Sequence, residues 1–188
     1  QQGQRVGIAK EIAVTGGTMQ ELAQRIKAVV PNVFMHQYTG DRSGANRRIG
    51  NKSTASMWDD LLDELGAREN QLDLPANPTH KQSREDVNYA LHHLDIAIDP
   101  SCTGLIYDLE RVEVDVNLSI LKSDRSQANQ RADLLDCFRY GVNTYLSATI
   151  ETHRKLHANA SMRQQPDGSR PDLMQRRGRE IVDRYLGS

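Results

Sequence analysis

The sequence predicts an α/β domain with a mixed, largely parallel sheet flanked by helices. Short β-rich apolar runs alternate with segments whose apolar residues recur at helical spacing, and turn-forming residues separate them. The length of 188 residues suits one domain of roughly 100–200 residues. Because strands that alternate with helices are typical of parallel sheets, we expect this domain over residues 1–150.

The composition narrows the class of protein. Hydrophobic residues make up 37% of the chain, and 24 Lys and Arg stand against 25 Asp and Glu, for a net charge of −1. This balance argues against bulk electrostatic coating of nucleic acid but allows a local basic surface. No apolar run approaches the roughly 20 residues that cross a bilayer, so we expect no membrane association. Two distant cysteines are too few for a disulfide framework.

Strand and helix patterns alternate most clearly over residues 6–44. Val6 to Val14 is rich in β-branched residues and predicts a strand, and Thr18 can cap the helix that follows, which ends before Pro31. Residues 33–38 predict a short buried strand, and the polar residues 39–44 predict a turn that contains two glycines.

The rest of the predicted domain continues this alternation. In chain order we expect a helix over 53–65, a strand over 70–74, a helix from Ser83 to about His93, a strand over 94–98, a helix after Asp99, a weak strand over 113–118 and a long helix from about Gln127 into the 150s. Ser83 is expected to start its helix because Asp86 lies three residues on, in the spacing of a capping box.

Residues 151–188 form a basic tail. They carry a net charge of +3, which leaves −4 on the first 150 residues. Residues 164–171 are polar, contain two prolines and predict a linker, and residues 172–186 predict a short amphipathic helix. We therefore place a domain boundary after residue 150.

Asp41 is the first candidate for chemistry. It lies between Gly40 and Gly44 directly after a predicted strand, and open α/β sheets place their active sites at the carboxyl ends of strands. Small neighbours also let an anionic ligand and a metal approach closely. The alternative is an ordinary solvated turn, in which the carboxylate accepts a local backbone hydrogen bond.

Asp133 and Asp136 are the second candidate. Residues three apart share a helix face, and two carboxylates there repel each other unless a cation lies between them. A hard divalent cation with oxygen ligands suits such a pair. Alternatively, Asp133 faces solvent and Asp136 pairs with Arg139 or Arg131.

Three segments, in this chain order, resemble motifs of one known family. Residues 38–44, Tyr-Thr-Gly-Asp-Arg-Ser-Gly, resemble the second acidic motif in the nuclease domain of large terminase subunits, the DNA-packaging motors of tailed bacteriophages. Residues 98–109 resemble the strand-to-helix segment typical of that family. Residues 133–140, Asp-Leu-Leu-Asp-Cys-Phe-Arg-Tyr, are similar to its third acidic motif. The resemblance covers roughly residues 6–146.

The resemblance implies a ribonuclease H-like fold and a metal-dependent endonuclease that cuts concatemeric double-stranded DNA during genome packaging, with Mg²⁺ or Mn²⁺. It makes Asp41 the second-motif carboxylate, Asp136 the third and Asp133 an auxiliary ligand, all three catalytic and metal-binding. Carboxylates that hold two cations about 3.5–4 Å apart can activate water and stabilise the leaving oxygen of a phosphodiester. The resemblance also implies a portal protein and a small terminase subunit as partners, and the cytoplasm of a bacterial host as the location.

One part of the family pattern is missing from the sequence. The first catalytic aspartate of the family lies on the first strand of the sheet, which should precede residues 6–14, and Glu11 is the one acidic residue in that opening segment. We therefore expect that the first strand and an ATPase domain lie upstream, outside this chain. Without them, this chain alone would bind metal weakly. Alternatively, some other carboxylate takes the position of the missing first aspartate.

Four basic residues around the predicted turn are candidates for DNA contact: Arg42, Arg47, Arg48 and Lys52. Contacts to phosphates would position DNA without reading its bases, and a solvated loop is the alternative. Two other functions stay open. One is a non-catalytic module that docks a packaging motor on DNA or on the portal, and the other is a different ribonuclease H-like enzyme such as a resolvase or transposase.

Overall fold

The structure is a computed structural model that describes residues 5–30, 32–46, 55–115, 124, 126 and 132–163. The chain divides into two compact units, Gln1–Ser147 and Ala148–Ser188. The first unit is α/β, as the sequence predicts, but its described residues form a sheet of two parallel strands and not the larger mixed sheet that was expected. The predicted linker and terminal helix, over 164–186, lie outside the described residues. No helix in the described part of the chain is long and apolar enough to cross a membrane.

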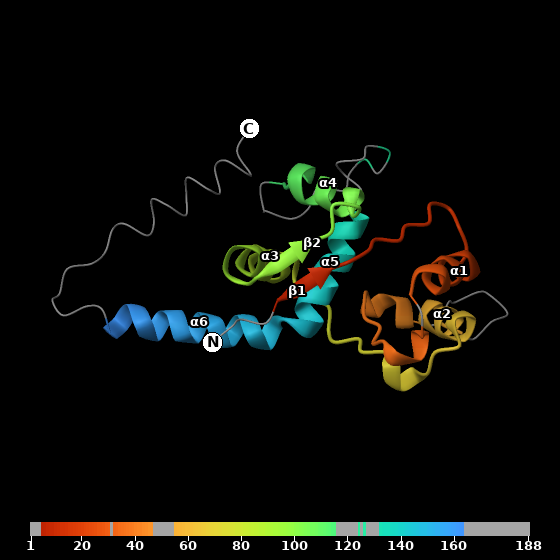
Figure 1. The fold of residues 1–188 in the computed structure, drawn as a ribbon, viewed down its shortest axis with the longest axis horizontal. Coiled ribbons are helices and arrows are strands. Elements are labelled where there is room, and N and C mark those ends of the chain that lie inside the picture. The colour runs from red at the N-terminus through yellow and green to blue at the C-terminus, as the bar shows by residue number, and fades with distance from the viewer. Residues whose placement is uncertain are drawn as a thin grey trace. The chain divides into compact units, whose positions relative to one another are not determined.

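The described part of the first unit combines two short strands with helices and 3₁₀ turns (Figure 1). In chain order its elements are β1 (Val6–Ile8), α1 (Met19–Val29), the 3₁₀ turns η1 (Val33–Met35) and η2 (Arg42–Ala45), α2 (Met57–Leu65), the 3₁₀ turn η3 (Glu69–Gln71), α3 (His80–His93), β2 (Ile96–Ile98), α4 (Thr103–Arg111) and α5 (Asp133–Tyr145). The second unit is described through α6 (Ser147–Arg163), whose first residue still belongs to the first unit.

The two strands pair in parallel, as the alternating pattern predicts, and lie side by side in Figure 1. Val6 lies opposite Ile96, and Ile8 lies opposite Ile98. The amide of Val6 donates to the carbonyl of Asp95 at 2.9 Å, which closes one end of the pair. The predicted strand over 94–98 is therefore confirmed in its last three residues.

The strand predicted over 6–14 is confirmed only in its first three residues. Beyond Ile8 the chain turns toward α4, where the Glu11 carboxylate accepts hydrogen bonds from the amides of Gly104 at 2.9 Å and Leu105 at 2.8 Å. These amides belong to the first turn of α4 and have no partner within the helix. Glu11 thus satisfies the start of α4, whose own N-cap residue, Cys102, makes no side-chain capping bond.

The helices α1 and α2 pack on each other around an apolar core. Buried residues of the core are Ala23, Val33, Leu61 and Leu65, and partly buried Met19, Leu22, Ile26, Tyr38, Trp58 and Ala67 pack against them. Thr18 caps α1 as predicted, by accepting a hydrogen bond from the Glu21 amide. Ser56 caps α2 in a capping box with Asp59, so the described helix begins later than the predicted residue 53.

The buried strand predicted over 33–38 is wrong. Asn32 adopts a left-handed backbone conformation with φ of 60°, and the next three residues form η1 instead. Phe34 and Met35 are 65% and 82% exposed, so their apolar side chains do not mark a buried strand. A short apolar run cannot by itself distinguish a strand from another local structure.

The strand predicted over 70–74 is also wrong, because η3 occupies the start of this segment. A single parallel bridge between Tyr38 and Leu72 remains from the two predicted strands. The Tyr38 amide donates to the Gln71 carbonyl at 2.7 Å, and the Asp73 amide donates to the Tyr38 carbonyl at 2.8 Å. This bridge holds the segment before the predicted turn beside the segment that leads to α3.

Helix α3 begins three residues before its predicted start. Thr79 is the N-cap, and its hydroxyl accepts a hydrogen bond from the Gln82 amide at 3.2 Å. Ser83 and Asp86, the predicted capping box, lie buried within the helix instead. Ser83 contacts Arg139 of α5, and Asp86 accepts a hydrogen bond from the Gln82 side chain of the same helix, so neither residue marks a helix start.

The long helix predicted from Gln127 is described as two helices. Residues 127–131 lie outside the described residues, α5 ends at Tyr145, and α6 begins at Ser147. Of the weak strand predicted over 113–118, residues 116–118 also lie outside them. Both α3 and α4 pack on α5. These helices bury the apolar side chains of Val87, Leu105, Leu135, Phe138 and Val142.

Candidate functional site

The Asp41 carboxylate is held in an exposed turn at the start of η2. Its Oδ1 atom accepts hydrogen bonds from the Ser43 amide at 2.8 Å and from the Asn77 side-chain amide at 2.7 Å. Burial pushes the pKa of Asp41 upward, but the hydrogen bonds from Ser43 and Asn77 outweigh it and lower the pKa below its ordinary value. The local backbone bond that the sequence allowed as an alternative is therefore present, on an ionised carboxylate.

Trp58 of α2 supports this turn from one side. Its indole N–H donates to the Asp41 carbonyl at 3.0 Å. A Cβ atom at Gly40 would lie 2.7 Å from the Trp58 ring, and one at Gly44 would lie 2.9 Å from its Nε1 atom. The small residues beside Asp41 thus make room for this indole.

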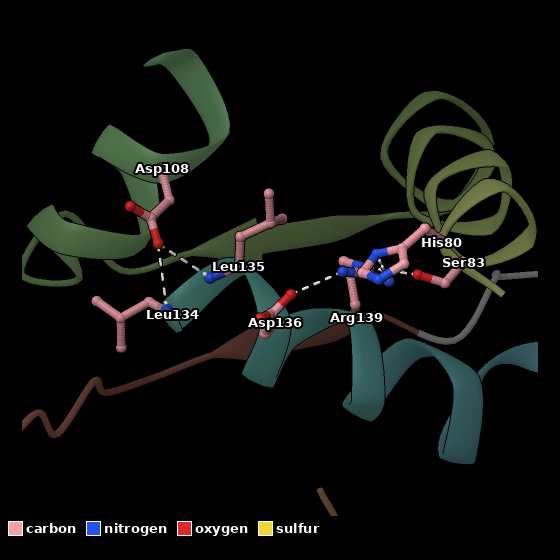
Figure 2. Close-up of polar contacts among 7 residues, drawn as sticks. All are labelled: His80, Ser83, Asp108, Leu134, Leu135, Asp136 and Arg139. Carbon is pink, nitrogen blue, oxygen red and sulfur yellow. Dashed lines mark hydrogen bonds and ion pairs between the residues drawn. The ribbon is translucent and has the colours of Figure 1, made fainter. Parts of the chain in front are cut away.

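Asp108 of α4 caps the start of α5. Its Oδ2 atom accepts hydrogen bonds from the Leu134 and Leu135 amides, both at 3.1 Å (Figure 2). Ala132, the N-cap residue, adopts φ of 50° and offers no side-chain acceptor, so a carboxylate from another helix takes this role.

The pKa of Asp108 is raised above its ordinary value. Burial is the main cause, and the charges of Asp133 and Asp136 add to it, although the two amides of α5 act in the opposite direction. Asp133 therefore lies within electrostatic reach of the capping carboxylate.

Asp136 forms an ion pair with Arg139 on the same face of α5, with 2.7 Å between Oδ1 and Nη1. Arg139 is only 6% exposed, and its other nitrogens meet the Ser83 hydroxyl and the Nδ1 atom of His80 on α3 (Figure 2). The pairing of Asp136 with Arg139 that the sequence left open as an alternative is therefore present. Arg131, the other partner considered, lies outside the described residues.

The two acidic segments meet at α5. The hydroxyls of Thr39, two residues before Asp41, and Thr144 lie 2.7 Å apart. The pKa of Tyr140 is raised by burial first, and then by the negative charges of Asp41 and Asp136, against the opposing charge of Arg139. Both predicted carboxylates thus act on the same phenol, although they lie far apart in the sequence.

The candidate carboxylates Asp41, Asp133 and Asp136 are the type of ligand that a divalent cation prefers, but they are not grouped in sufficient number to hold one. Carboxylate oxygens are the ligands that Mg²⁺ and Mn²⁺ prefer. In the part of the chain that the structure describes, however, no three His, Cys, Asp or Glu side chains are grouped so that they could hold a metal ion. Glu11 does not take the position of the missing first aspartate, because both of its oxygens bind the start of α4. The described residues alone are therefore not a complete metal centre.

Of the four basic candidates for DNA contact, the structure describes Arg42. Its side chain is exposed, and its backbone amide donates to the Asn77 Oδ1 atom at 3.0 Å. Arg47, Arg48 and Lys52 lie outside the described residues. Their grouping around the turn therefore stays a prediction.

The sequence did not predict three contacts that shape this region. They are made by the side chains of Asn77, Asp108 and Trp58. Asn77 lies between Pro75 and Pro78, a context that indicates only a loop. Asp108 is part of an ordinary helical pattern, and nothing local predicts that it caps a helix 26 residues later. These contacts depend on which segments the fold brings together.

No protein-family model, no curated protein and no solved structure matches this chain. The resemblance to terminase nuclease domains therefore depends on the residues themselves.

The contact of Gly40 with Trp58 predicts a specific coupling. Gly40→Ala should lower the free energy of unfolding by about 1–3 kcal/mol, because the rigid indole must move to admit the methyl group. Most of this loss should disappear in a Trp58→Leu background. Urea denaturation of the two single variants and the double variant measures the coupling. Gly141→Ala is the control, because no atom lies within 4 Å of a Cβ at Gly141; equal losses at Gly40 in both backgrounds would contradict the contact.

The raised pKa of Asp108 predicts a pH-dependent stability. Because the pKa is higher in the folded state, this residue stabilises the fold most below about pH 4, near the unfolded value, and the contribution is lost as the pH rises through the raised value. Asp108→Asn keeps an oxygen acceptor for α5 but does not ionise. The stability of this variant relative to wild type should therefore increase between about pH 3 and pH 6.5. Urea denaturation at both pH values, with the exposed Asp63→Asn as control, tests this. A difference that stays constant would contradict the raised pKa, and a difference that decreases would show the sign to be wrong.

Proposed function

We propose that this chain supplies part of the active site of a metal-dependent endonuclease that cuts double-stranded DNA, in the manner of the nuclease domain of a phage large terminase. The observation that carries the proposal is that the Asp41 turn lies against α5, the helix of Asp136, where the hydroxyls of Thr39 and Thr144 lie 2.7 Å apart. The charges of both carboxylates also help to raise the pKa of Tyr140. A solvated turn and an isolated surface ion pair would not need to lie together. A two-metal phosphodiesterase site does need carboxylates from distant segments in one place.

A ribonuclease H-like fold is part of this proposal. The parallel pairing of β1 with β2 supports it, as do the helices α4 and α5 that follow β2. Asp41 also lies shortly after the parallel bridge between Tyr38 and Leu72.

Asp41 and Asp136 would hold Mg²⁺ or Mn²⁺ together with a further carboxylate that the described residues do not supply, and Asp133 would be an auxiliary ligand. When bound, the metal would supply an activated water and charge neutralisation at the phosphate. The hydrogen bonds to Asp41 keep its carboxylate ionised. The Arg139 guanidinium fixes Oδ1 of Asp136, which makes Asp136 a directed ligand and not a mobile one.

Two other side chains have roles in the proposal. The raised pKa of Tyr140 keeps its phenol protonated near neutral pH, so that it can donate a hydrogen bond to a phosphate oxygen. The exposed Arg42 next to Asp41 would contact the DNA backbone, together with Arg47, Arg48 and Lys52. Portal protein and small terminase subunit as partners, and the cytoplasm of a bacterial host, follow from the resemblance and belong to the same proposal.

Cleavage of supercoiled plasmid with Mn²⁺ or Mg²⁺ tests the proposal. Asp41→Asn and Asp136→Asn should each lower the cleavage rate at least about tenfold, because a metal-binding carboxylate is lost. Asp63→Asn, an exposed acidic residue of α2, is the matched control and should cleave like wild type. Equal residual nicking by wild type and both site variants would point to contamination and reject the enzymatic function.

A non-catalytic docking module is the second candidate. The finding that favours it is the absence of a group of three metal-binding side chains among the described residues. An apolar pocket of about 420 Å³ beside β1 and α5 is lined by neither Asp41 nor Asp136. Binding of DNA without metal-dependent cleavage would favour this candidate.

A further inference from the structure

We propose that this chain associates with a second copy of itself, by inserting the exposed side chains of Phe34 and Met35 into the apolar pocket beside β1 and α5 of that copy. The contact is heterologous, because one surface of each copy meets a different surface of the next. It does not depend on the proposed nuclease function, since neither Asp41 nor Asp136 lines this pocket.

The η1 turn presents two large apolar side chains to solvent. Phe34 is 65% exposed and Met35 is 82% exposed, whereas Val33, the first residue of the same turn, is buried in the core between α1 and α2. Residues 28–40 contain no Asp, Glu, Lys or Arg. The turn can therefore be withdrawn from water without the cost of removing one of these charges.

The buried side chain of Gln71 holds this turn in one conformation. Its Nε2 atom donates to the Val33 carbonyl at 2.9 Å and to the His36 carbonyl at 2.8 Å, on either side of the exposed pair. The Tyr38 hydroxyl also donates to the Val33 carbonyl, at 2.9 Å. Because the backbone is already fixed, the turn loses less conformational freedom when it binds.

The pocket suits apolar side chains in volume and in lining. Its volume is about 420 Å³. Since a cavity of about 150 Å³ already admits a benzene ring, this volume suffices for the ring of Phe34 together with the unbranched chain of Met35. In the described part of the chain, no atom lies within 4 Å of a Cβ at Gly7 or Gly141, two residues that line the pocket. The apolar side chains that line it include Leu105, Leu134, Phe138, Val142 and Leu146.

The two charged residues at the pocket can keep their surroundings when it is filled. The Glu11 carboxylate accepts hydrogen bonds from the first turn of α4. Lys10 is exposed, so its ammonium can stay in water while its methylene chain covers an apolar insert. An apolar side chain can therefore enter without burying an unpaired charge.

A second copy is the occupant because one chain carries both halves of the contact. Phe34 and Met35 are exposed and do not line the pocket, so they do not fill the pocket of their own chain. Each copy thus has an apolar turn for one neighbour and an apolar pocket for another. Removal of both apolar surfaces from water stabilises the contact.

Sedimentation equilibrium of the full chain tests the inference. Wild type should associate reversibly between about 10 µM and 1 mM, as expected of a small apolar contact. The turn variant, Phe34→Ser with Met35→Ser, removes the inserted side chains, and the pocket variant, Gly141→Leu, fills the pocket from α5. Each should associate at least about tenfold more weakly than wild type. Leu156→Ser removes a side chain of α6 that is 60% exposed, and this matched control should associate like wild type.

A mixture of the two variants gives the sharpest result. The turn variant keeps its pocket and the pocket variant keeps its turn, so equal amounts should form a dimer of twice the monomer mass and nothing larger. Recovery of this dimer also shows that both variants are folded. Association of the turn variant equal to that of wild type would overturn the inference, whether or not Gly141→Leu folds. A wild type that stays monomeric at about 1 mM would overturn it as well, and would leave the pocket to a small apolar ligand or a different protein.

Discussion

The buried guanidinium of Arg139 determines where α5 lies. A charge withdrawn from water is costly unless it is paired and hydrogen-bonded, and Arg139 meets this requirement with Asp136 on its own helix and with Ser83 and His80 on α3. Because a guanidinium can only donate, the Nδ1 atom of His80 is the acceptor in this contact. Because α5 also carries Tyr140, Asp133 and Thr144, the candidate site depends on this one buried cation.

The acidic residues around α5 have structural roles that do not depend on any catalytic role. Asp108 caps α5, Glu11 satisfies the start of α4, and Asp136 neutralises Arg139. This use explains part of the acidic excess in the first 150 residues without a metal. A carboxylate can nevertheless serve both purposes, because an oxygen held by a fixed donor gives the other oxygen a defined direction. The proposal therefore requires Asp136 to be both counter-ion and ligand.

The sequence predicted those features that depend on neighbouring residues and missed those that depend on contacts across the fold. The cap at Thr18, the end of β2 and the candidate acids at Asp41 and Asp136 all follow from local patterns. The strand predicted over 33–38 failed because φ at Asn32 redirects the chain, and the cap predicted at Ser83 failed because that hydroxyl serves Arg139. The contacts of Asn77 and Asp108 join segments 36 and 26 residues apart, a distance over which spacing carries no information.

The convergence of the two acidic segments is the central claim, and the pKa of Tyr140 measures it most directly. The phenol can be titrated by ¹³C NMR with Tyr140→Phe for assignment. Because negative charge disfavours the phenolate, Asp41→Asn and Asp136→Asn should each lower the pKa of Tyr140, whereas Asp63→Asn should leave it unchanged. A Tyr140 pKa that does not respond to Asp41→Asn would show that the turn and α5 do not meet, and would contradict the account.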